Sequence, residues 1–171
     1  NDFVLDLAGI DLSTKVNGGE IIIDRGKLTG VLIDNSMNLV DNIIPEPTKD
    51  EAIKALLSAQ EIAFKNGLTT ISDAGLTKNQ IDLIDELHQD GILKIRMYAM
   101  IQNDSSSINY FLKTGPYKTD RLNVRSVKVY VDGALGSRGA LLIDDYSDRK
   151  GHKGIIVTPI DSISSLAFKL A

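Results

Sequence analysis

The feature that most constrains this chain is a repeated order of elements that begins at Thr48. A capping box at Thr48–Glu51, in which each side chain binds a free backbone N–H, starts a helix that ends at Gly67. A second box at Thr77–Gln80 starts a helix that ends at Gly91. Helices that alternate with β-rich runs are typical of βα units around a parallel sheet. We therefore expect adjacent parallel strands, in sequence order, near 68–72, 93–101 and 124–131.

Two further helices complete this pattern, one over about 106–113 and one that starts with Asp161 as its N-cap. Residues 1–47 differ from the rest. Two β-rich runs, Glu20–Ile23 and Leu28–Ile33, flank the turn residues 24–27, which predicts a β-hairpin. The chain therefore divides into a hairpin-containing segment at 1–47 and a βα segment at 48–171.

Composition excludes several classes of protein. The 171 residues suffice for one ordinary domain with a core, and the net charge of −4, spread along the chain, argues against nucleic acid as a partner. Without cysteine the chain has no disulfide, thiolate zinc site or cysteine nucleophile. No apolar run reaches the ~18 residues of a membrane span, and the start is not basic like a signal peptide. We expect a soluble, cytoplasmic protein without a membrane partner.

The ends of the chain suggest a piece of a larger protein. The sequence begins at Asn1 rather than at a methionine, and its last residues still follow an apolar helical pattern. It also contains only two histidines, His88 and His152. Neither shows ligand-like spacing, and we expect both to be structural or solvated, with His88 on a surface helix.

The run Val124–Asp132 is expected to form a strand with polar and ionisable side chains on one face. Alternation puts Val127, Val129 and Val131 on one side, and Ser126, Lys128, Tyr130 and Asp132 on the other. In a closed βα barrel the valines would face the helices and the polar side chains the barrel axis near its active end. An interior lysine there must be paired or chemically changed. The alternative is an edge strand with Lys128 in water.

A loop of small residues, Gly133–Ala140, follows this strand. Its backbone can approach a ligand closely, which suits a loop at an active-site mouth, whereas a flexible connector is the alternative. The loop does not match phosphate-binding glycine patterns, so it gives little support for nucleotide binding.

Together these segments resemble the YtcJ-like metal-dependent amidohydrolases, the amidohydrolase 3 group. The most specific match is the loop with its strand, and the similarity extends over essentially the whole chain. The matching stretches are Val127–Ala140, Tyr146–Asp148, Gly67–Gly75, Lys94–Ala99, Gly18–Ile21 and Leu28–Leu32.

The resemblance implies an α/β fold, a partial (β/α)8 (TIM-type) barrel. Residues 1–47 would form an insertion between barrel strands 1 and 2, and 48–171 would cover about strands 2–4. It implies a hydrolase of amide or cyclic amide bonds in small molecules that acts by metal-hydroxide attack. Lys128 matches a lysine that carbon dioxide converts to a carbamate ligand of divalent metal, here expected to be zinc. The family's histidine and aspartate ligands have no counterpart here, so we expect this chain alone to bind metal weakly and to be inactive.

Five further side chains are candidate substrate contacts. Asp73 and Arg96 stand at expected strand ends, where each contacts the substrate or a residue behind it, and the alternative for each is a structural salt bridge in the barrel interior. A non-catalytic α/β domain that holds an anion through Lys128, Arg138 and the loop is the rival function. If barrel strands are missing, Tyr98 and Tyr130 should be exposed or covered by another chain, and self-association is expected. The five candidates are Asp73, Arg96, Tyr98, Asp132 and Arg138.

Overall fold

The computed structural model describes residues 1–170, and these form two compact units. One unit is Pro47–Val129. The other combines Asn1–Glu46 with the segment that begins at Tyr130. We describe each unit by itself.

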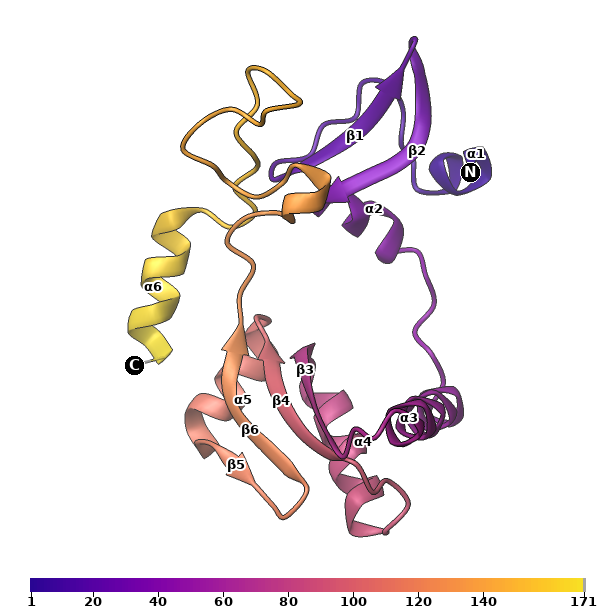
Figure 1. The fold of residues 1–171 in the computed structure, drawn as a ribbon, viewed down its shortest axis with the longest axis vertical. Helices are drawn as coiled ribbons and strands as arrows, with labels where there is room; N and C mark the ends of the chain where they lie inside the picture. The colour runs from indigo at the N-terminus through magenta and orange to yellow at the C-terminus, as the bar shows by residue number, and fades with distance from the viewer. Residues whose placement is uncertain (171) are drawn as a thin grey trace. The chain divides into compact units, whose positions relative to one another are not determined.

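The first unit contains three helices and four strands (Figure 1). Both predicted capping boxes are present, at Thr48 with Glu51 and at Thr77 with Gln80, and they start α3 and α4. The elements are α3 (Lys49–Lys65), β3 (Thr70–Leu76), α4 (Lys78–Gln89), β4 (Arg96–Gln102), α5 (Ser105–Thr114), β5 (Tyr117–Lys118) and β6 (Leu122–Lys128).

The four strands form one sheet in the order β3-β4-β6-β5. β3 pairs with β4, and β4 with β6, in parallel, which confirms the predicted adjacency and order of these three strands. The short β5 is antiparallel to β6 and pairs only with Asn123 and Val124. The predicted bounds were partly wrong, because β3 starts later than expected and β6 ends at Lys128. Val131 therefore lies outside the strand and is exposed.

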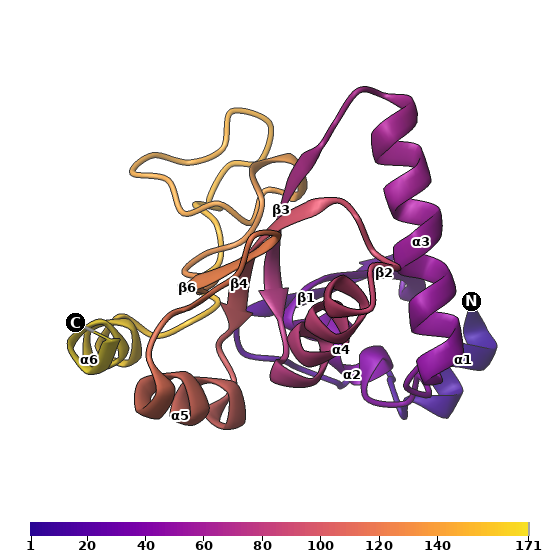
Figure 2. The same cartoon turned by 90° about the horizontal axis from the view of Figure 1, so that it is seen from below.

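Apolar side chains from α3, α4, β4 and β6 build the core of this unit. Figure 2 shows the ribbon of these elements from below. Met97, Ala99 and Ile101 alternate along β4 and are buried there, as period-2 geometry requires. Burial of side chains as large as Met97 and Ile101 supplies roughly 1.5–3 kcal/mol each.

His88 belongs to this core rather than to the surface. Its residue is only 9% exposed, and its Nε2 donates to the carbonyl oxygen of Ile95 over 2.9 Å. The expectation of a surface position was therefore wrong, whereas the structural role is confirmed. The histidine falls one position after Leu87 on the buried side of α4, where the helix passes the entry to β4.

The second unit contains the predicted hairpin. β1 (Gly19–Asp24) pairs antiparallel with β2 (Lys27–Asp34) around a two-residue turn. The turn residues Arg25 and Gly26 have φ of 48° and 76°. Positive φ at both positions is typical of a type I′ turn, whose twist matches that of the flanking strands.

The other elements of this unit are short, apart from one helix. They are α1 (Asp2–Leu7), η1 (Asn35–Met37), α2 (Asn38–Asp41), η2 (Leu135–Ser137) and α6 (Ile160–Leu170). Asp161, expected as an N-cap, lies inside the first turn of α6 because the helix starts one residue earlier. In the described part of the chain, no helix is long and apolar enough to cross a membrane.

Candidate functional site

Lys128 is the last residue of β6, at the carboxyl end of the parallel strands. Its ladder partner on β4 is Gln102, which is likewise the last residue of its strand. The neighbouring pair, Ile101 with Val127, belongs to the helix-covered face, so Lys128 and Gln102 lie on the opposite face. The lysine is half-buried there. A cation at this position stands where α/β sheets place ligands.

Arg96 lies at the other end of the sheet. It is the first residue of β4, six residues before Gln102, and a strand advances about 3.3 Å per residue. Its guanidinium donates to the hydroxyl oxygens of Thr70 and Thr69 over 3.0 and 2.9 Å. These contacts favour a structural role for Arg96 at the amino ends of the strands, about 20 Å from the level of Lys128.

Asp73 is exposed in the middle of β3 and pairs in the ladder with Ala99, which belongs to the core face. It therefore does not share the face of Lys128. Neither Asp73 nor Arg96 takes part in the salt bridges found among residues 1–170.

Tyr98 does share the face of Lys128. Its hydroxyl donates to Ser126 Oγ over 3.0 Å, and the guanidinium carbon of Arg125 lies 6.0 Å from the ring centroid. The hydrogen bond with Ser126, and then Arg125, lowers the pKa of the Tyr98 hydroxyl. Tyr98 is half-buried, whereas Tyr130, after the strand, is exposed.

Asp132 lies directly before the small-residue loop Gly133–Ala140 and binds the residue directly after it. Its Oδ2 accepts from the backbone N–H of Leu141 over 2.8 Å, and its backbone forms a bridge with Ile156. Within the loop, Gly133 N–H donates to Gly139 O and Gly139 N–H donates to Ala134 O. Because backbone hydrogen bonds hold both ends, this loop is ordered rather than a free connector.

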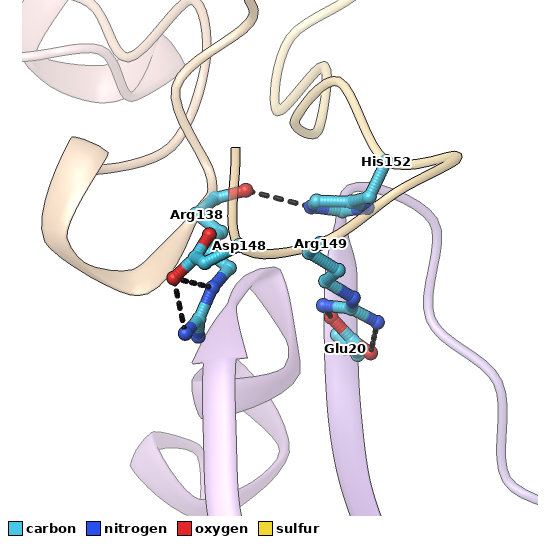
Figure 3. A network of polar contacts seen from close by, with 5 residues as sticks. All are labelled: Glu20, Arg138, Asp148, Arg149 and His152. Carbon is cyan, nitrogen blue, oxygen red and sulfur yellow. Dashed lines mark hydrogen bonds and ion pairs between the residues drawn. The ribbon is translucent and has the colours of Figure 1, made fainter. Parts of the chain in front are cut away.

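Arg138 is held by its own loop and by the segment that follows (Figure 3). Its guanidinium donates twice to Asp148 Oδ2, over 3.0 and 2.7 Å, which lowers the pKa of Asp148. His152 Nε2 donates to the Arg138 carbonyl oxygen over 2.7 Å. The Arg138 guanidinium is thus hydrogen-bonded to a carboxylate of the same chain. This contact adds no support for the alternative function, a domain that binds an anion through Arg138.

A second ion pair ties this segment to the hairpin. Arg149 donates to both carboxylate oxygens of Glu20 over 2.9 and 2.6 Å (Figure 3). These hydrogen bonds lower the pKa of Glu20. A two-bond arginine–carboxylate pair fixes orientation as well as distance. The sequence offered no local signal for it, because the two residues are 129 positions apart.

Sequence reasoning also missed Asp34. This residue has a positive φ of 52°, rare for a residue with a side chain, and ends β2. Its Oδ2 is buried without a hydrogen-bond partner in the structure, and it packs against Gly133 and Gly139, where an added Cβ would lie 2.2 and 2.6 Å from it. Asp34 thus contacts the small-residue loop from the hairpin.

Comparison with known proteins agrees with this geometry. A family model described as the amidohydrolase family matches residues 1–169. The chain belongs to the amidohydrolase family. Two solved structures from Pyrococcus horikoshii OT3 and Pyrococcus furiosus, each described as an uncharacterized metal-dependent hydrolase, align with TM-scores of 0.72 and 0.71. They are 23% and 24% identical, cover 99% of this chain, and are themselves covered over 34% and 35%. These two likenesses show the fold.

Two curated relatives match at the level of sequence. Protein LONG AFTER FAR-RED 3 of Arabidopsis thaliana is 30% identical over 96% of this chain, and YtcJ of Bacillus subtilis (strain 168) is 26% identical over 99%. The chain spans about a third of their length, 31% and 33%. The resemblance to YtcJ-like amidohydrolases stated from the sequence is thus confirmed, and the mixed α/β fold is that of the family.

The side chains of this amidohydrolase segment offer little to a metal ion by themselves. Residues 1–170 contain no group of three or more His, Cys, Asp or Glu side chains that could hold one. Lys128 ends β6 on the face opposite the core, but a protonated lysine amine has no lone pair to offer. The donor set fits a metal only if the amine is converted to an anionic oxygen ligand and further ligands join it.

Proposed function

We propose that the full-length protein is a metal-dependent hydrolase of carbon–nitrogen bonds in small molecules, amides or cyclic amides, in which Lys128 is a metal ligand. The observation that carries this proposal is the position of Lys128 at the carboxyl end of β6, on the face away from the helices, directly before the loop that matches the amidohydrolase signature.

Three parallel strands in sequence order, with helices between them, support a partial (β/α)8 barrel for Pro47–Val129. In such a barrel the face opposite the helices is the interior, and the carboxyl ends of the strands surround the active site. Lys128 and Gln102 would both stand at that mouth. This arrangement explains why a charged residue ends a strand whose first half is buried.

The Lys128 amine can become a suitable ligand by one covalent step. The neutral amine nitrogen forms a bond to the carbon of carbon dioxide and releases one proton to solvent, which leaves an anionic carbamate with two oxygen donors. A bound divalent metal, with zinc as the expected ion, supplies an activated water for attack on the amide carbonyl. The chain's own contribution is to hold the carbamate at the strand end, and other ligands would come from segments outside this chain.

The test is metal content and hydrolysis by the full-length protein beside its Lys128→Ala variant. We expect the variant to lose its metal and to lose activity on a panel of simple amides and cyclic amides by more than about a hundredfold, because a ligand is missing. Added short carboxylic acids should restore part of both by replacing the carbamate oxygens. Lys118→Ala, at an exposed lysine of β5 in the same sheet, is the matched control. Full metal content in Lys128→Ala would exclude Lys128 from the site.

A further inference from the structure

Over the stretch where β6 pairs with β4, β6 contains one residue more than β4. On β4, Ala99 and Met100 are consecutive, and their ladder partners on β6 are Val124 and Ser126. Arg125 is thus the extra residue of a β-bulge. A bulge bends the strand and redirects the side chains that follow it.

The bulge decides which face Lys128 occupies. Leu122 and Val124 are buried in the helix-covered core with exposures of 1% and 0%. Strict alternation from them would continue through residue 126 to Lys128 and direct the lysine into that core. With the extra residue, Val127 packs against the core instead, and Lys128 lies on the opposite face beside Gln102.

Two side chains of the bulge contact the same tyrosine on the adjacent strand. Ser126 Oγ accepts the 3.0 Å hydrogen bond from the Tyr98 hydroxyl, and the Arg125 guanidinium lies over the Tyr98 ring at 6.0 Å. Tyr98 and Ser126 are half-buried, whereas Arg125 is exposed, so the hydrogen bond is the better shielded of the two contacts. An aromatic ring has only two side-chain torsions to order, which makes it a stiff support.

We propose that Tyr98 is a positioning residue, which holds the bulge at Arg125 and Ser126 and thereby keeps Lys128 on the open face of the sheet. This inference rests on the proposed function, because Tyr98 would matter for activity only if Lys128 is a metal ligand. The role is distinct from the substrate contact expected from the sequence, because it acts through the Tyr98 hydrogen bond to Ser126 within the sheet. The bulge lies two residues before Lys128, so a shift there is passed directly to the strand end.

Tyr98→Phe in the full-length protein tests the proposal, because it removes the hydroxyl and keeps the ring. We expect backbone amides of 122–128 to exchange with deuterium about fivefold faster, the effect of losing one hydrogen bond on local opening. We also expect less bound metal per protein molecule, because Lys128 is held less firmly. Arg125→Met should produce a smaller change of the same sign. Tyr110→Phe, on α5 in the same unit, should match the wild type.

The outcomes separate this inference from the proposed function. Lys128→Ala measured in parallel reports on the function alone, and full metal content in that variant would defeat it. Suppose instead that Lys128→Ala is free of metal while Tyr98→Phe keeps its full metal content. Tyr98 would then have no positioning role, whatever its exchange rates. Unchanged exchange over 122–128 in Tyr98→Phe would equally overturn the proposal.

Discussion

The two compact units are stabilised by different interactions. Pro47–Val129 has a contiguous apolar core in which side chains such as Ile84, Leu93 and Ile95 are almost completely buried. In the segment from Tyr130 to 158, by contrast, Tyr146 is the one large side chain that is buried. The ion pair of Arg149 with Glu20 and the hydrogen bond of Asn35 to the Val157 carbonyl connect this segment to the hairpin and to the turn after it. Apolar packing is strong and non-directional, whereas polar contacts fix orientation with small net stability. The first unit therefore supplies a rigid strand end, and the second a loop whose shape depends on individual contacts.

The largest effect is expected in the apolar unit. Ile84→Ala removes a side chain that is 1% exposed and leaves a cavity between α4 and the sheet. We expect the free energy of unfolding of this unit to fall by about 2–5 kcal/mol. Denaturant unfolding, with Ile143→Ala at a 91% exposed position as the control, measures it. A loss below about 1 kcal/mol would show that apolar packing does not dominate here.

A glycine in the second unit should be the next most sensitive position. Gly154 has φ of 108°, and an added Cβ would lie 2.1 Å from the carbonyl oxygen of Ala140. Gly154→Ala must move the backbone, and we expect a cost of about 1–3 kcal/mol, limited to the loop. Limited proteolysis should show faster cleavage within 138–158 and no change within 49–128. Gly136→Ala, where the added atom meets open space, is the control.

The Glu20–Arg149 pair should contribute less, about 1 kcal/mol, because both side chains are partly exposed. Arg149 lowers the pKa of Glu20 in the folded state. The contribution is therefore complete above the ordinary value of 4.5 and is lost as pH falls through the lower folded value. A double-mutant cycle with Glu20→Gln and Arg149→Met should give a smaller coupling energy at pH 3 than at pH 7.

A matched comparison sharpens that test. Asp24 and Arg25 form a longer ion pair of 3.9 Å, and both side chains are largely exposed. Asp24→Asn should leave the free energy of unfolding unchanged at both pH values. If the two ion pairs contribute equally to the free energy of unfolding, the two-bond geometry of Arg149 adds no stability.

The smallest expected effect is the pH response of the apolar unit. Burial lowers the pKa of His88, so the folded state favours the neutral ring. Its contribution to stability is complete above the ordinary value of 6.5 and declines as pH falls below it. We expect the unfolding free energy of wild type to decline slightly between pH 7 and 5, and this slope to shrink in His88→Gln. A slope that His88→Gln leaves unaltered would assign the response to other groups.

Several elements in both units follow from local sequence. The boxes at Thr48 and Thr77 involve residues three positions apart, and the hairpin turn at Arg25–Gly26 lies within its own four residues. Such interactions form within a few residues of chain, so the sequence alone indicates them. The lysine that ends β6 was likewise identified from strand periodicity and from its resemblance to a family.

Other features depended on partners that are distant in the chain. The spacing of Leu122, Val124 and Val127 hints at the bulge, but only the pairing with β4 shows that Arg125 is the extra residue. His88 is a buried donor because the Ile95 carbonyl faces it, and the guanidinium of Arg138 pairs with Asp148, ten residues further along the chain. The sequence was enough to predict the capped helices, the hairpin, the order of the three parallel strands and the family, but not the end of β6 at Lys128. Tertiary structure decided the face and the partner of each polar side chain, because those depend on strand register and on burial, which arise only when distant segments pack together.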